Sequence, residues 1–154
     1  MEEEVKQKFI DAGKAVQEAK DVAEDVAEPG IEFITIAEKI EESIREKGLE
    51  PAFPVNISRN EEAAHYTPGP RDDRVMKESD VLKIDIGAHK DGYIADTAIT
   101  VNPSGEHREM IETAQEVLEK ALEFIEPGKT VGELGTYIEK QVPSEYNVVQ
   151  NLTG

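Results

Sequence analysis

The sequence contains no cysteine among its 154 residues. Disulfide bonds and thiolate metal sites are therefore excluded, and any bound metal must use oxygen and imidazole ligands. Basic residues are scarce, with 17 Lys and Arg against 34 Asp and Glu, and the formal net charge of -17 disfavours nucleic acid and anionic membranes as partners. No apolar run is long enough to span a bilayer, and the acidic beginning does not resemble a secretory signal. We therefore expect a cytoplasmic protein that binds neither nucleic acid nor membrane.

The composition is that of a globular chain. Hydrophobic residues make up 38% of the sequence and charged residues 33%, a balance that excludes a disordered chain. This length fits one domain with a sizeable core. The acidic excess is also compatible with a salt-adapted surface, and composition alone does not separate the two interpretations.

The stretch from residue 81 to 101 predicts a β-hairpin, because two alternating β-prone runs flank Asp91-Gly92. If these two residues form the turn, counting outward makes Asp85 and Asp96 diagonal neighbours on one face of the hairpin. A four-residue turn would place them directly opposite each other on the same face. Only an odd loop length without a bulge would separate them.

The other face of this hairpin is almost wholly apolar and must be covered. Its members are Leu82, Ile84, Ile86, Ala88, Tyr93, Ala95, Thr97, Ile99 and Val101. On the opposite face, two close carboxylates repel each other unless one is protonated or a cation lies between them. A hard or borderline metal ion would relieve that repulsion, whereas an ordinary hairpin with solvated acids is the simpler alternative.

Apolar periodicity predicts helices over residues 3–27 and 110–125, the first of which stops at Pro29-Gly30. A second helix is expected to open with a capping box formed by Thr35 and Glu38. Alternation over residues 53–58 favours an edge strand.

The chain also contains an internal repeat, because Glu126-Pro127-Gly128 follows Glu28-Pro29-Gly30 by 98 residues. Each unit consists of a long helix, this string, a short helix and a strand. The strands are expected at 53–58 and 148–152. The repeat divides the chain into a first unit, 1–101, and the start of a second, 104–154, within a single partial domain.

Four strings carry a resemblance to a known family. They are Pro51-Ala52-Phe53-Pro54-Val55-Asn56, Ala63-Ala64-His65-Tyr66-Thr67-Pro68, Asp85-x-Gly87-x-x-x-Asp91-Gly92-Tyr93-Ile94-Ala95-Asp96, and Asn151-Leu152-Thr153-Gly154. In this order and spacing they resemble the amino-terminal half of the catalytic domain of a type 2, archaeal-like methionine aminopeptidase. Without that context His65 would more often be a structural histidine.

The resemblance implies an α+β pita-bread fold, with a complete first αβ unit and a truncated second one. It implies a metalloexopeptidase that removes the initiator methionine from nascent proteins with two divalent metal ions, Co, Mn, Fe or Zn. By the same resemblance, Asp85 and Asp96 are metal ligands. His65 would hydrogen-bond the substrate and act in catalysis, and Phe53 would wall the methionine pocket.

One feature of the family is missing from the sequence. The family completes its site with a histidine and two glutamates from the second half, which leads us to expect weak metal binding and an inactive chain when alone. Beyond the amino terminus of a peptide or nascent protein, the expected partners are a second-half polypeptide or another copy of this chain. The alternatives are a split-enzyme subunit, a pita-bread protein that binds partners without catalysis, and a purely structural α+β interaction domain.

Overall fold

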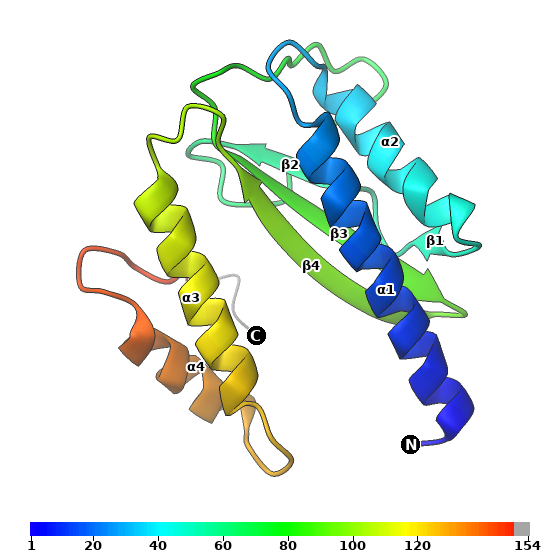
Figure 1. Ribbon diagram of the computed structural model, residues 1–154, viewed down its shortest axis with the longest axis vertical. Coiled ribbons are helices and arrows are strands. Elements are labelled where there is room, and N and C mark those ends of the chain that lie inside the picture. The colour runs from blue at the N-terminus through cyan, green and yellow to red at the C-terminus, as the bar shows by residue number, and fades with distance from the viewer. Residues whose placement is uncertain (150–154) are drawn as a thin grey trace. The chain divides into compact units, whose positions relative to one another are not determined.

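The computed structural model describes residues 1–149, which fall into two compact units with a boundary between Glu106 and His107. In the first unit, α1 (Glu3–Val26) and α2 (Phe33–Glu46) cover one face of a four-stranded sheet (Figure 1). Helices and antiparallel strands are thus segregated, as an α+β fold requires. Among the helices of residues 1–149, none combines the length and apolar character needed to cross a membrane.

The sheet is organised around β3 (Leu82–Lys90), which pairs antiparallel with each of the other strands. On one side lies β4 (Tyr93–Val101), and on the other lie β1 (Glu50–Pro51) and β2 (Asn56–Arg59). The turn between β3 and β4 has positive φ at both central residues, Asp91 (52°) and Gly92 (86°). This conformation matches the twist of two-residue hairpins, so the predicted hairpin and its register are confirmed.

The core lies between the helices and the apolar face of the hairpin. Alanines of α1 at positions 12, 15, 19 and 23 are at most 4% exposed, and their small side chains let the helix approach the sheet closely. From α2 and β3 the large fully buried side chains are Phe33, Ile36, Ile40, Ile44, Leu82, Ile84 and Ile86. Their helical spacing of three or four and strand spacing of two are the periods that predicted these elements.

The predicted capping box at the start of the second helix is wrong. The helix begins two residues before Thr35, at Phe33, and its N-cap residue Glu32 makes no side-chain capping bond. A tertiary contact satisfies the first turn instead, because the Phe33 amide donates to the Arg74 carbonyl at 2.9 Å and Glu32 bridges to Val75.

The predicted strand over residues 53–58 is shorter and later than expected, since only Asn56–Arg59 is a strand. Pro54 has no amide hydrogen, and the Val55 amide donates to the Glu41 carboxylate at 3.2 Å rather than to a neighbouring strand. Residues 53–55 therefore leave the sheet ladder.

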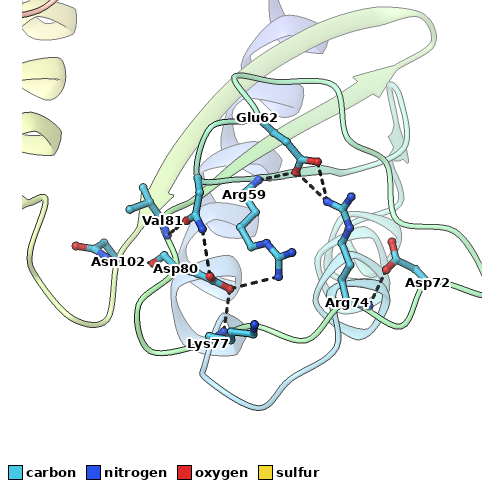
Figure 2. Close-up of polar contacts among 9 residues, drawn as sticks. Arg59, Glu62, Asp72, Arg74, Lys77, Asp80, Val81 and Asn102 are labelled. Atoms are coloured by element: carbon cyan, nitrogen blue, oxygen red, sulfur yellow. Dashed lines mark hydrogen bonds and ion pairs between the residues drawn. The ribbon is translucent and has the colours of Figure 1, made fainter.

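A buried carboxylate joins the end of β2 to the start of β3. Asp80 is 3% exposed and accepts hydrogen bonds from the Lys77 amide at 3.0 Å and the Asn60 side chain at 3.4 Å. Arg59 lies 3.8 Å from the same carboxylate, and the Val81 amide donates to Asn60 at 2.9 Å (Figure 2). These bonds fix both ends of the long loop between the two strands.

The second unit contains α3 (Arg108–Phe124) and α4 (Val131–Gln141), which pack on each other through stacked rings of Phe124 and Tyr137. The predicted helix over 110–125 is confirmed. A capping box does open α4, where the Glu133 amide donates to the Thr130 hydroxyl and the Thr130 amide donates back to the Glu133 carboxylate. Of the strand expected at 148–152, residues 148 and 149 are not in a strand, and the rest lies outside the described residues.

The helix boundaries of the two units follow the spacing of the sequence repeat. Helix α1 ends at Val26 and α3 at Phe124, while α2 begins at Phe33 and α4 at Val131. Each pair is separated by 98 residues, like the two Glu-Pro-Gly strings. The glycines of both strings have φ near 100°, at 95° and 100°, which only glycine adopts readily.

Candidate metal centre

The structure places Asp85 and Asp96 on the same face of the hairpin, opposite the helices. Asp85 pairs with Ala98 and Asp96 with Gly87, so the two aspartates are diagonal neighbours, as the turn predicted. Asp96 is exposed and Asp85 is half-buried. We call this side of the sheet the acid face.

The two carboxylates interact directly. Partial burial raises the pKa of Asp85, and the negative charge of Asp96 and a hydrogen bond with its carboxyl group raise it further. His65 and a hydrogen bond from Asn56 act in the opposite direction. Two charged carboxylates are therefore unfavourable here, and a cation between them would remove the repulsion.

His65 is exposed in the loop that follows β2, with a positive φ of 69°. Its imidazole is one of the groups that lower the pKa of Asp85. Non-glycine residues with positive φ are uncommon, and they occur where the surrounding structure holds them.

The residue after His65 supplies that support. The Tyr66 carbonyl accepts from the Ile57 amide at 2.7 Å, and the Tyr66 amide donates to the Ser58 hydroxyl at 3.2 Å. Arg74 lies over the Tyr66 ring at 3.6 Å, a cation–π contact.

Two carboxylates bind Arg74 and Tyr66 in turn. Arg74 also binds both carboxylate oxygens of Glu62, at 2.9 and 2.8 Å (Figure 2), while the Tyr66 hydroxyl donates to Asp72. The Arg74 guanidinium lowers the pKa of Glu62, so the pair stays ionised. None of these residues was predicted, because they are joined through a loop with no periodicity.

Phe53 lies against Gly87, the residue opposite Asp96. A Cβ atom at position 87 would lie 2.3 Å from Cε1 of the Phe53 ring, so only glycine permits this approach. The ring therefore covers the acid face beside the two carboxylates. This arrangement gives the site an apolar surface next to a charged one.

Known proteins are similar to this chain in sequence and in fold. The family model of metallopeptidase family M24 matches residues 7–154. The chain belongs to metallopeptidase family M24. The methionine aminopeptidase of Archaeoglobus fulgidus is 44% identical over 155 residues, covering 100% of this chain and 53% of that protein. The methionine aminopeptidase of Pyrococcus abyssi is 47% identical over 148 residues, covering 96% of this chain and 50% of that protein.

Solved structures of two peptidases share the fold. A methionine aminopeptidase from Thermotoga maritima superposes with a TM-score of 0.83 at 30% identity, over 92% of this chain and 61% of that one. A prolidase from Pyrococcus furiosus, at 23% identity, superposes with a TM-score of 0.77 over 91% and 42%. The α+β pita-bread fold and the resemblance to archaeal methionine aminopeptidases are confirmed. This chain spans about half the length of the curated relatives it matches.

M24 membership implies metal ions, and the acid face fits part of such a site. Asp85 and Asp96 provide hard oxygen donors whose mutual repulsion a divalent cation would relieve. Within residues 1–149, no cluster of three or more His, Asp or Glu side chains is arranged to hold a metal ion. The two acids could therefore supply only part of the donor set that a metal ion needs.

The repulsion predicts a stability effect. Because the pKa of Asp85 is raised on folding, the folded state binds protons more strongly than the unfolded state, and stability should rise as the pH falls from neutral through that raised pKa. We expect Asp85→Asn to stabilise the metal-free chain at neutral pH and to flatten this dependence. Thermal unfolding measures both between about pH 4, near the ordinary carboxyl pKa, and about pH 8. A loss of stability at neutral pH would contradict the proposed repulsion.

Proposed function

We propose that this chain forms the first part of a methionine aminopeptidase site that removes amino-terminal methionine from peptides and nascent proteins in the cytoplasm. The observation that carries the proposal is the acid pair, because Asp85 and Asp96 are diagonal neighbours on one face of the hairpin and His65 acts on the pKa of Asp85. The similarity of the chain to archaeal methionine aminopeptidases supports the choice of substrate. We further propose that residues 1–101 and 104–154 belong to a single partial pita-bread domain.

Each residue has a distinct role in this proposal. Asp85 and Asp96 hold part of a two-metal centre, with Co, Mn, Fe or Zn as candidates. Bound divalent cations would polarise the scissile carbonyl and lower the pKa of water. His65 donates a hydrogen bond to the carbonyl oxygen as negative charge develops there. Phe53 supplies an apolar wall for the methionine side chain.

The site is incomplete by the same reasoning. Two carboxylates leave most of the coordination sphere to water, so metal binding by this chain should be weak. The remaining ligands and a general base would come from a second-half polypeptide. This is the arrangement expected of a split-enzyme subunit, and we propose that the chain alone is inactive. Another copy of this chain is the competing partner.

Metal binding tests the acid pair. We expect the chain to bind Mn²⁺ weakly, and Asp85→Asn or Asp96→Asn to weaken binding by more than about tenfold, because each removes a negatively charged oxygen donor. Asp91→Asn is the matched control, since it makes the same change in the same hairpin at the turn and not on the acid pair. Isothermal titration calorimetry measures the Mn²⁺ affinity of the unmodified chain and of the three variants.

Two results would contradict the proposal. Tight Mn²⁺ binding by this chain would show that the donor set is not partial. Binding that is indifferent to both Asp85→Asn and Asp96→Asn would place the metal elsewhere.

A further inference from the structure

A neutral side chain lies directly beside the acid pair. Asn56 on β2 is the cross-strand partner of Asp85 on β3. Partners in an antiparallel pair project from the same face of a sheet, so the Asn56 amide shares the acid face. Directly opposed residues of an antiparallel pair have Cβ atoms about 4.5–5.5 Å apart, so the amide can reach the Asp85 carboxylate.

A second residue fixes the orientation of that amide. The Thr67 hydroxyl donates to Oδ1 of Asn56 at 2.6 Å. With its carbonyl oxygen turned to Thr67, the amide presents its NH₂ group to the carboxylate. The flipped orientation would place a carbonyl oxygen against the Asp85 carboxylate, where it would repel the negative charge. The hydroxyl and the carboxylate therefore select the same orientation.

Thr67 is itself anchored. It directly follows Tyr66, whose backbone is bonded to β2 at Ile57 and Ser58 and whose ring is covered by Arg74. Thr67 also lies two residues after His65. The contacts that hold the histidine loop thus hold the hydroxyl that orients Asn56.

We propose that Asn56 is a positioning residue, held by Thr67, which aims the Asp85 carboxylate across the acid face toward Asp96. A neutral amide suits this role because it restrains the carboxylate while leaving its charge available to a cation, whereas a lysine would compete with the cation. The predicted effect on metal binding rests on the proposed function above. The hydrogen bonds from Thr67 to Asn56 and from Asn56 to Asp85, which we call the relay, do not depend on that function.

The relay is tested first without metal. In a ¹⁵N-labelled chain, Thr67→Val and Asp85→Asn should each shift the side-chain NH₂ resonances of Asn56. Thr67→Ser keeps the hydroxyl and should leave these resonances near their positions in the unmodified chain. Thr100→Val is the matched control, because Thr100 is on β4 and pairs with Lys83. If neither Thr67→Val nor Asp85→Asn changes the chemical shifts of the Asn56 NH₂ group, the relay is refuted.

The positioning role is then tested with Mn²⁺ alone, using the electron paramagnetic resonance signal of the free ion. Asn56→Leu should weaken binding by about tenfold, a typical effect of removing a group that orients a ligand. Thr67→Val should weaken binding by less. It should add nothing in the Asn56→Leu background, because Thr67 acts through Asn56. Thr100→Val should leave the affinity unchanged.

The outcomes separate the relay from the metal site. Additive effects of Thr67→Val and Asn56→Leu on Mn²⁺ affinity would overturn the positioning role. Shifted amide resonances with no Mn²⁺ binding by any form would support the relay and refute the metal centre instead. Thr67 is exposed, so Thr67→Val keeps the test decisive if Asn56→Leu fails to fold.

Discussion

A polypeptide that supplies the remaining half of an archaeal methionine aminopeptidase is expected to bind this chain and to cleave a methionyl peptide that neither half cleaves alone. The proposed site contains only two acidic ligands and a histidine from the described residues, and the relatives are about twice as long as this chain. In the mixture, Asp85→Asn should lower the rate on the order of a thousandfold, since several kcal/mol of charge stabilisation depend on the metals. Light scattering and a methionyl-peptide assay measure association and cleavage.

The same mixture distinguishes the alternatives. Asp91→Asn should leave cleavage near the unmodified level. Cleavage by this chain alone would refute the proposal that its site is incomplete. A stable monomer that does not bind the second-half polypeptide would refute complementation. Association without cleavage would favour the pita-bread binding protein. A homodimer detected by light scattering, with no response to the second half, would identify another copy of this chain as the partner.

The largest loss of stability is expected from Ile84→Ala. Ile84 is 0% exposed in β3 and belongs to the hydrophobic core between the sheet and the helices. Removing its branched side chain should cost about 2–5 kcal/mol of unfolding free energy, because the transfer of apolar surface is lost and a cavity remains. Urea denaturation with linear extrapolation measures the difference.

Ile94→Ala is the control for this substitution. Ile94 belongs to the same hairpin but lies on the acid face and is 50% exposed, so its truncation should cost less than about 1 kcal/mol. Equal losses at the two positions would mean that the helices do not cover the face assigned to them.

The hairpin was predictable because its information is local. A two-residue turn and a side-chain period of two fix which residues face the core, and they also fix Asp85 and Asp96 on one face. The ends of α1 and α3 were predictable for a similar reason, since a Pro-Gly pair follows each helix.

The start of α2 and the extent of β2 depended on distant residues. The Phe33 amide finds its partner at Arg74 and the Val55 amide at Glu41, so neither local capping nor alternation decides the outcome. Tertiary bonds of this kind leave no periodic trace in a sequence.

The candidate site was predictable in part. Phe53 contacts Gly87 on the acid face, and His65 acts on the pKa of Asp85, but neither observation tests the site. Their chemical roles stay predictions. Asn56 and Thr67 belong to the family strings, but their contact was not predicted, because one side-chain hydrogen bond between a strand and a loop has no sequence pattern.

The local origin of the acid pair also affects the entropy of its assembly. Asp85 and Asp96 are joined by a short tight turn, so bringing them together restricts few residues of the chain. The contact between Asn56 and Asp85 instead closes the long loop that contains Asp80, and loop closure costs more as the loop lengthens. The hydrogen bonds that anchor both ends of that loop offset part of the entropic cost of closing it. The restraint on Asp85 is therefore linked to the stability of the loop between β2 and β3, whereas the proximity of the two acids is not.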